Sequence, residues 1–290
     1  MGMRKLSASM AALLCLAGPS LAQFGSGPGE FIFPAGLALD RQGNIYVTET
    51  GNDRVQKLDS SQEWMAGWGR FGPDSSHFND PLGITVAGPD LVLVADSGNR
   101  RIASFSAEGR LLSFFSLPDS SLAWGLAVGG GQLYLSDEAR GVIEVRGFDG
   151  ELKQVIGGQG REPGQLDKPR GVALDPGGRI WVVDSGNNRI QIFSPEGLPV
   201  KAIGSYGDDE GEFDGPSGIA ISPQGLVYVT DSGNDRFQEF DLDGAFRSQA
   251  GSSGSEPVQF LNPTGIAVDD QGGLYIVDSD NHRIQFLSSQ

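Results

Sequence analysis

The sequence has one cysteine, two histidines and fewer basic than acidic residues. Its 290 residues include 21 Lys and Arg against 37 Asp and Glu, which gives a formal net charge of −16. A single cysteine cannot form an intramolecular disulfide or a CxxC metal or redox site. Two histidines fall short of the three protein ligands, mostly His, of a usual catalytic zinc site. The acidic balance disfavours nucleic acid and anionic membranes as partners, because both bind basic faces.

Long apolar runs are also absent, except near the N-terminus. There, two basic residues precede an apolar stretch at about 6–17, and small residues lie at −3 and −1 of a cleavage site after Ala22. This pattern predicts a cleaved secretory signal peptide and a secreted or periplasmic protein. A lipoprotein signal acylated at Cys15 is disfavoured, because Leu14 occupies a position that requires a small residue. Cleavage would leave a cysteine-free chain 23–290 with a net charge of −18.

An internal repeat organises the remaining chain. Each repeat has a Pro-x-Gly motif, an apolar run, a Gly-bearing turn, a second apolar run that ends in an acidic residue, and a Ser-Gly-Asn-x-Arg motif before a third apolar run. The Pro-x-Gly glycines recur at steps of 47, 42, 46, 47 and 47 residues, and the acidic residues at steps of 47, 41, 47, 47 and 47. Two markers with the same step indicate six copies of one unit. The glycines are Gly36, Gly83, Gly125, Gly171, Gly218 and Gly265, and the acidic residues are Glu49, Asp96, Asp137, Asp184, Asp231 and Asp278.

Each repeat has the pattern of four short strands joined by tight turns, predicted in the fourth repeat at 171–175, 179–184, 189–193 and near 200–203. One such sheet cannot bury both faces, whereas radial stacking of six sheets closes a ring. The sequence therefore predicts an all-β fold, a six-bladed β-propeller of four-stranded antiparallel blades, preceded by a signal peptide. The predicted boundaries are 1–22 for the signal peptide, 23–290 for the propeller, and approximately 31–77, 78–120, 121–164, 165–212, 213–259 and 260–290 for the repeats, with 23–30 closing the ring and 23–25 joining the edge of the last blade.

Two repeats carry a specific motif after their second apolar run. It is Asp184-Ser-Gly-Asn-Asn-Arg-Ile-Gln in one and Asp231-Ser-Gly-Asn-Asp-Arg-Phe-Gln in the other, each after Pro-x-Gly-(Ile/Val)-Ala. This motif resembles the NHL repeat, and the resemblance extends over residues 31–290. It implies a six-bladed propeller but not one activity, because the scaffold hosts unrelated functions. The amidating lyase that resembles this family depends on a histidine-rich zinc site, and its animal RNA-binding members use a basic top face; the two histidines and the acidic charge disfavour both.

The acidic residue, the Asn and the Arg of the repeated motif are predicted to stabilise the turn between the second and third strands. Asp and Asn side chains cap backbone groups in turns, and an Arg five residues after the Asp can pair with it. Because function seldom repeats identically in each structural unit, we interpret this set as structural rather than as a ring of metal ligands. Its members are Asp96, Asn99, Arg101, Asp184, Asn187, Arg189, Asp231, Asn234, Arg236, Asp278, Asn281 and Arg283.

The residue between Pro and Gly differs from repeat to repeat and is predicted to lie at the mouth of the central channel. Trp124 and Arg170 occupy this place in neighbouring blades, and an aromatic ring beside an arginine is a candidate recognition pair. Alternatively, Trp124 packs in place of the proline that Ala123 replaces in the third repeat. The predicted ligand-binding set at the mouth is Trp124, Arg170, Ser217, Thr264 and Leu82.

No metal or other cofactor is predicted for the channel. The middle residues of the first strands, Ala38 and its equivalents, are expected to line it, and they offer only Thr85 as an oxygen ligand, whereas hard cations require several together. An acidic run between repeats four and five is a candidate for weak Ca²⁺ binding or for a basic partner, and a solvated loop is its simpler interpretation. This run contains Asp208, Asp209, Glu210, Glu212 and Asp214.

The leading functional hypothesis is a secreted, monomeric binding or scaffold propeller, not an enzyme, that engages a protein, peptide or cell-envelope ligand at the channel mouth. The alternative is a metal-assisted propeller enzyme, a lyase or lactonase, and RNA binding is a third possibility. The third repeat departs most from the pattern, with Arg140 at the Asn position and Val142 at the Arg position. Its turn has either drifted or been reshaped for a ligand.

Overall fold

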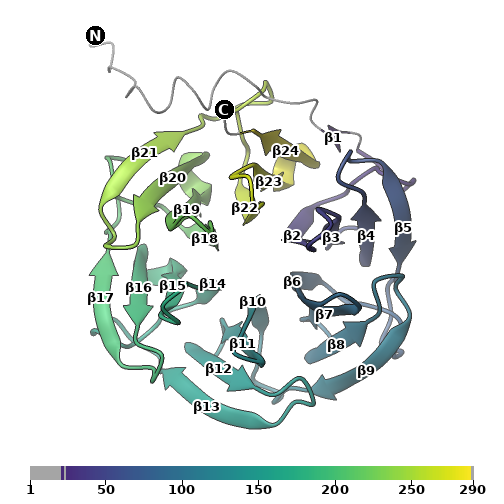
Figure 1. The fold of residues 1–290 in the computed structure, drawn as a ribbon, viewed down its shortest axis with the longest axis horizontal. Helices are drawn as coiled ribbons and strands as arrows, with labels where there is room; N and C mark the ends of the chain where they lie inside the picture. Colours follow the sequence, from purple (N-terminus) through teal and green to yellow (C-terminus); the bar gives the residue numbers. More distant parts are fainter. Residues whose placement is uncertain (1–20, 23, 289–290) are drawn as a thin grey trace.

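Six antiparallel sheets form a ring of blades around a central channel (Figure 1). The computed structural model describes residues 21–22 and 24–288. This arrangement confirms the predicted all-β, six-bladed propeller. Blades one to three consist of β2 (Pro34–Leu39), β3 (Ile45–Glu49), β4 (Arg54–Leu58) and β5 (Trp64–Trp68); β6 (Pro81–Gly88), β7 (Leu91–Asp96), β8 (Arg101–Phe105) and β9 (Leu111–Ser116); and β10 (Ala123–Gly129), β11 (Gln132–Asp137), β12 (Val142–Arg146) and β13 (Leu152–Gly157).

The other three blades follow in the same order, with the first strand of each blade nearest the channel (Figure 1). Three short 3₁₀ turns, at Ser185–Asn187, Ser232–Asn234 and Ser279–Asn281, follow the second strands. No helix of the described segments is long and apolar enough to cross a membrane. Blades four to six consist of β14 (Pro169–Leu174), β15 (Ile180–Asp184), β16 (Arg189–Phe193) and β17 (Pro199–Ile203); β18 (Pro216–Ile221), β19 (Leu226–Asp231), β20 (Arg236–Asp241) and β21 (Phe246–Ala250); and β22 (Pro263–Val268), β23 (Leu274–Asp278), β24 (Arg283–Leu287) and β1 (Leu21–Ala22).

The N-terminal strand β1 completes blade six. Its two residues pair with β24, Leu21 opposite Ile284 and Ala22 opposite Arg283. This pairing precedes the segment 23–25 that we expected at this edge. Gln23 lies outside the described residues, and Phe24 forms a bridge with Phe31 in the loop that enters blade one. The ring is thus closed by pairing between the two ends of the described chain.

The hydrophobic core is divided among the junctions between blades. Six clusters of buried side chains occur, one between each pair of neighbouring blades. Between blades four and five, for example, Trp181 and Ile192 of one blade pack in a cluster with Val227 and Phe240 of the next. Each sheet buries both of its faces against the neighbouring blades. Apolar residues that alternate between the two faces of a strand therefore pack against one neighbouring blade or the other.

The Pro-x-Gly glycines allow neighbouring blades to approach closely at the channel. A Cβ added at Gly83 would lie 2.2 Å from the carbonyl oxygen of Trp124 in the next blade. At all six glycines the nearest atom to such a Cβ is the carbonyl oxygen of the residue before the next blade's glycine, at 2.2–2.7 Å. No side chain fits in this space, so the repeat requires glycine here for close packing rather than for a turn.

The channel itself is narrow and apolar. A cavity of about 60 Å³ within it is lined by the six glycines, by the residue that follows each one, such as Leu37 and Ile84, and by Trp124. Ala38 and its equivalents, which we expected to line the channel, are not among the residues that line this cavity. Ala38 packs in the junction between blades one and two, and Ala173 in that between blades four and five. The innermost strands therefore place branched aliphatic side chains at the channel.

Candidate functional site at the channel mouth

The repeated turn holds a buried carboxylate in a network of hydrogen bonds. In blade four, Asp184 is completely buried and accepts from Arg189 Nε at 2.7 Å. Its carboxylate also accepts from Asn187 Nδ2 and Gln191 Nε2, both at 3.0 Å, and from the backbone N–H of Asp167 at 2.7 Å. Every oxygen lone pair that burial removes from water is thereby given a donor, so this geometry supports a structural role.

The arginine of each regular turn also holds the preceding loop. In blade five, Arg236 donates to the backbone carbonyls of Asp208, Asp209 and Glu212. Burial raises the pKa of Asp231, while hydrogen bonds from Asn234 and Arg236 favour its ionised form. The same ion pair occurs in five blades, with N–O distances of 2.5–2.7 Å.

Blade three rebuilds this network with other residues. Asp137 is completely buried and accepts from the N–H of Leu122, as its equivalents do. Arg140, at the position of the repeated Asn, pairs with both Asp137 and Glu144, and Arg146 Nε lies 2.7 Å from Glu144 Oε2. An ion pair is retained, so the turn of this blade is rearranged without losing its buried charge compensation.

The mouth cluster, Trp124, Glu138, Arg170 and Ser217, joins three neighbouring blades. The guanidinium carbon of Arg170 lies 5.4 Å from the centroid of the Trp124 ring. Arg170 Nε is 3.2 Å from Glu138 Oε2, and Arg170 Nη1 donates to Ser217 Oγ at 3.0 Å. The Arg170 side chain is 30% exposed and that of Glu138 is 17% exposed. Ser217 is completely buried, so the part of the cluster that solvent reaches consists of Trp124, Glu138 and Arg170.

The rest of the predicted mouth set does not present side chains in the same way. Thr264 is buried and donates from Oγ1 to the carbonyl of Ala35 at 3.0 Å. Ala35 is also buried, and Leu82 is half-buried. Of the predicted set, the structure thus brings together Trp124, Arg170 and Ser217. The mouth is one-sided, with its partly exposed side chains on blades two to four.

Sequence reasoning missed Glu138. This residue stands in the position that carries Ser97, Ser185 or Ser232 in other blades, and there Ser97 and Ser232 donate to a carbonyl of the next blade. A carboxylate at that position was a visible departure from the repeat. Its partner Arg170 lies 32 residues away, so the pairing itself required the fold.

The two histidines lie apart, His77 in the connection between blades one and two and His282 in the turn between β23 and β24 of blade six. His77 Nε2 accepts from Arg70 Nε, and its Nδ1 lies 3.2 Å from Asp74 Oδ2. His282 Nδ1 accepts from the backbone N–H of Phe33 at 3.1 Å. Within residues 21–22 and 24–288, no group of three or more His, Cys, Asp or Glu residues is arranged to hold a metal ion.

The acidic run between blades four and five forms the same loop as in other blades. Asp208, Asp209 and Glu210 are exposed, and Glu212 Oε2 accepts from the N–H of Asp209 at 3.2 Å. Asp214 donates its N–H to the buried Asp231. The backbone of the run is therefore fixed by the repeat, and its binding of Ca²⁺ or of a basic partner stays a prediction.

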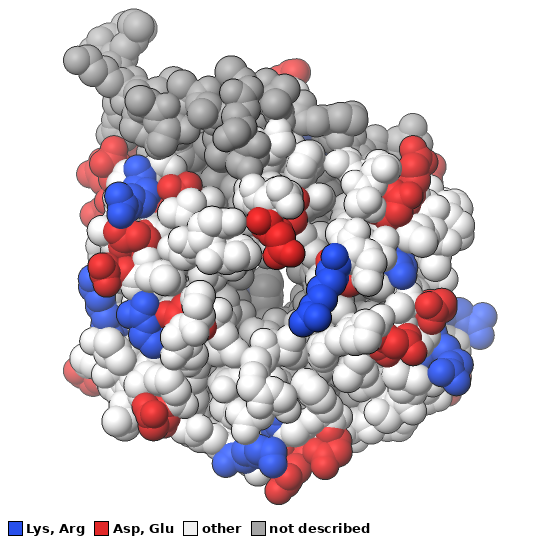
Figure 2. Space-filling view, in the orientation of Figure 1, with Lys and Arg blue, Asp and Glu red and all other residues white. Residues whose placement is uncertain are grey.

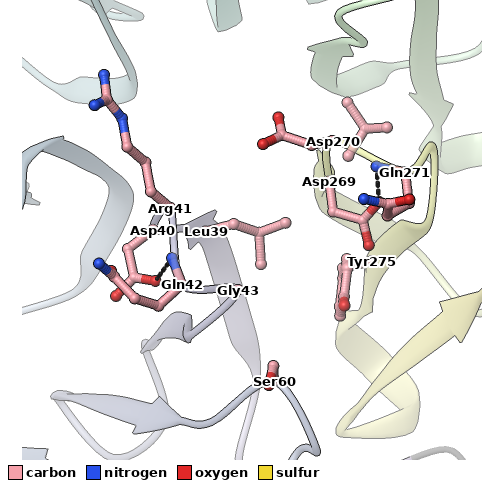
Figure 3. A pocket seen from close by; sticks show the side chains of 11 residues that line it. Leu39, Asp40, Arg41, Gln42, Gly43, Ser60, Asp269, Asp270, Gln271 and Tyr275 are labelled. Atoms are coloured by element: carbon pink, nitrogen blue, oxygen red, sulfur yellow. Dashed lines mark hydrogen bonds between the residues drawn. The ribbon is translucent and has the colours of Figure 1, made fainter.

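Figure 2 shows an acidic group and a basic group at the rim of the central opening, with mostly uncharged residues around the rest of it. A separate pocket of about 490 Å³ lies between blades one and six, at the turns that join first and second strands, and residues of the two blades face one another across it (Figure 3). Asp40 and Asp269 line it, but their Oδ1 atoms accept from Gln42 N and Gln271 N in their own turns, both at 2.9 Å. These carboxylates are engaged in turn formation, which makes the pocket a weaker candidate than the mouth cluster.

The model of the NHL repeat matches residues 31–58, 166–193, 213–240 and 260–285. The chain contains NHL repeats within its six-bladed propeller. The four matched segments lie in blades one, four, five and six, where the buried Asp or Glu and the Arg of the turn are both present. Blades two and three of this NHL propeller are recognised from their place in the ring.

Curated relatives of the NHL propeller match parts of it. A probable peptidyl-alpha-hydroxyglycine alpha-amidating lyase, pgal-1, of Caenorhabditis elegans is 36% identical over 92 residues, 30% of this chain and 26% of the relative. The human E3 ubiquitin-protein ligase NHLRC1 is 30% identical over 153 residues, 51% of this chain and 38% of the relative. The chain thus spans less than two-fifths of the length of either.

A solved structure shares the fold over almost the whole ring. A catalytically inactive virginiamycin B lyase from Staphylococcus aureus with quinupristin superposes with a TM-score of 0.65 at 16% identity, over 91% of this chain and 82% of that one. Identity this low shows a common propeller architecture and does not transfer an activity.

Proposed function

We propose that this NHL propeller is a binding or scaffold module that engages a protein, peptide or cell-envelope ligand at the channel mouth. The observation that carries the proposal is convergence. Trp124, at a position that differs in every blade, and Glu138, at which blade three departs from the repeat, meet Arg170 of blade four in one partly exposed cluster. Residues that repeat in each blade serve the fold, so residues that depart from the repeat and gather at one place are the candidates for a specific role.

The chemistry of the mouth cluster suits recognition of another molecule. Trp and Arg are the residue types most enriched at binding hot spots, and an arginine stacked on an indole keeps its planar donors in a fixed direction. Within the described part of the chain, Arg170 Nη2 donates no hydrogen bond, and it remains available to an acceptor of the partner. Glu138 offsets the charge of Arg170, which favours a polar or mixed ligand over a simple anion.

The test is capture of partners by the mature protein from the envelope fraction of its source. We expect Trp124→Ala and Arg170→Ala each to weaken retention of the captured partner at least about tenfold, as for a hot-spot residue. Trp64→Ala and Arg41→Ala are matched controls, because both side chains are exposed away from the mouth cluster. Equal loss in the controls, or full retention by both mouth variants, would contradict the proposal.

A second candidate function is a metal-assisted lyase or lactonase. It is favoured by the match to an amidating lyase and by the likeness to the virginiamycin B lyase fold. Metal analysis of the purified protein separates the two functions. One tightly bound divalent ion per chain would favour the enzyme, whereas metal-free protein that retains a partner through Trp124 and Arg170 would favour the binding module.

We also propose that the protein is exported and binds no RNA. Residues 1–22 support export, and β1 lies just before the predicted cleavage site, so cleavage after Ala22 would remove this strand. Mass spectrometry of the exported protein measures its N-terminus directly. The net charge of −16 opposes RNA binding, and filter binding in 50 mM salt tests it, since electrostatic affinity is greatest in dilute salt.

A further inference from the structure

Neighbouring blades are joined by a recurring hydrogen bond that involves the variable residue of the Ser-Gly-Asn-x-Arg motif. In four of the six junctions, the side chain of this residue accepts from the backbone N–H of the residue before the first strand of the next blade. We call this side chain the junction acceptor. The pairs are Asp53 with Asp80 at 2.9 Å, Asn188 with Gly215 at 2.7 Å, Asp235 with Asn262 at 2.9 Å, and His282 with Phe33 at 3.1 Å.

The backbone fixes both members of each pair. The four junction acceptors have φ between 49° and 55°, and the four donors have φ between 46° and 54°, all in the left-handed region. Asn, Asp and His are enriched among non-glycine residues there. The phenylalanine is therefore the departure from the pattern, and it stands at the junction whose acceptor is a histidine.

That junction is the one that closes the ring. His282 belongs to blade six and Phe33 to blade one, 249 residues apart in the chain. The imidazole also packs edge-on against two rings of the entering segment, Phe24 at 4.9 Å and Phe33 at 4.5 Å between centroids. We call the hydrogen bond between His282 Nδ1 and the N–H of Phe33, with these ring contacts, the closing joint.

An imidazole nitrogen accepts a hydrogen bond only when it carries no proton. If His282 binds a second proton, Nδ1 becomes a donor that faces the N–H of Phe33, and the hydrogen bond is lost. Carboxyl and amide groups, as at the other three junctions, retain an acceptor oxygen in either protonation state, whereas imidazole is the side chain that ordinarily titrates between pH 5 and 8. We propose that the closing joint is an acid-sensitive closure, which holds blades six and one together at neutral pH and loosens when His282 is protonated.

The charged groups around the joint do not replace this bond. On the same turn, Asp280 accepts from Asn262 at 3.4 Å, and Asp278 is paired with Arg283. From blade one and its entering loop, Glu49 accepts from the N–H of Ile32 and is paired with Arg54, and Glu30 accepts from the N–H of Gly27. Within the described residues, no ion pair joins any of these groups to His282. No neighbouring carboxylate is therefore positioned to stabilise the protonated imidazole.

The chain supplies matched variants for the test. His282→Asn introduces the residue of the junction between blades four and five, and His77→Gln introduces the residue found at the equivalent loop position, Gln165. Thermal unfolding of the full chain is measured at pH 7.5 and at pH 5.0 for the wild type and both variants. We expect acidification to lower the melting temperature of the wild type and of His77→Gln by about 2–4 °C more than that of His282→Asn.

A second measurement follows the joint itself. In NMR spectra, we expect the amide signal of Phe33 to shift with the same midpoint as the His282 ring protons in the wild type, and to stay unchanged over this range in His282→Asn. Equal pH dependence of the melting temperature in the wild type and His282→Asn would overturn the proposal. A Phe33 amide that does not respond to His282 protonation would overturn it as well.

Discussion

Blades three and four contain the same buried carboxylate but use different residues around it. In blade four, Asp184 is bound by Asn187, Arg189 and Gln191 in the pattern of the repeat. In blade three, Asp137 accepts a hydrogen bond from Arg140, which also forms an ion pair with Glu144. The contrast shows that the carboxylate and a compensating cation are the fixed requirement, while the position of the cation along the chain can change.

Blade three also differs from the regular blades at the channel mouth. Glu138 replaces the serine of the repeat and reaches Arg170, and Trp124 stacks with the same guanidinium. In blade five, by contrast, Ser232 donates to the carbonyl of Pro263, a contact that joins blades. We therefore expect changes in regular blades to affect stability and changes in the mouth cluster to affect binding.

The largest expected effect is at the buried ion pair of a regular blade. Arg236→Ala leaves Asp231 completely buried and without its cation, which is expected to cost about 3–5 kcal/mol in the free energy of unfolding. In the same blade, Arg247→Ala breaks an exposed pair with Asp241 and is expected to cost at most about 1 kcal/mol. Urea unfolding measures both. Similar losses in the two variants would remove the distinction between repeated and exposed charges.

The next effect concerns the close approach of innermost strands. Gly83→Ala places a Cβ 2.2 Å from the carbonyl oxygen of Trp124, which is expected to cost about 1–3 kcal/mol through displacement of a neighbouring blade. Gly88 lies in the same strand, β6, and nothing lies within 4 Å of an added Cβ. Gly88→Ala is therefore expected to change the melting temperature little. If the two variants melt alike, the spacing of blades is not set by these glycines.

A smaller effect on stability is expected at the mouth. Glu138→Ser restores the residue of the repeat and removes a partly exposed ion pair, so the free energy of unfolding is expected to change by at most about 1 kcal/mol. Partner retention is expected to fall, because Arg170 loses the group that orients it. A large destabilisation with unchanged retention would mean that the cluster serves the fold instead.

The smallest expected effect is a stabilisation, an increase in the melting temperature. Burial raises the pKa of Glu239, an effect that the nearby Arg247 opposes, and Glu239 lies opposite the buried Tyr228 in the ladder of blade five. A raised pKa in the folded state means that Glu239 contributes stability below its unfolded value and that this contribution is lost as the pH rises. Glu239→Gln is therefore expected to melt about 1–2 °C above the wild type at pH 7 and to lose this advantage at pH 4. A variant that melts below the wild type at pH 7 would contradict this assignment.

Most of the fold was predictable, and part of the site was. The repeat markers correctly predicted six blades, and Trp124 and Arg170 were paired from their place in the motif. The predicted channel lining was wrong because alternation along a strand gives two faces but does not say which residues approach the axis. Thr264 was included in the mouth set by position alone, and the structure buries its side chain against Ala35.

By itself, the sequence determined the period, the number of blades and the residues of the repeated turn, because strand alternation and turn chemistry act over a few residues. Only the tertiary structure decided which residues meet between blades: Glu138 with Arg170, 32 residues apart, and His282 with Phe33, 249 residues apart. These contacts arise when the packing of whole sheets closes a ring. No local pattern encodes them, since each depends on the relative position of two blades that fold as separate sheets.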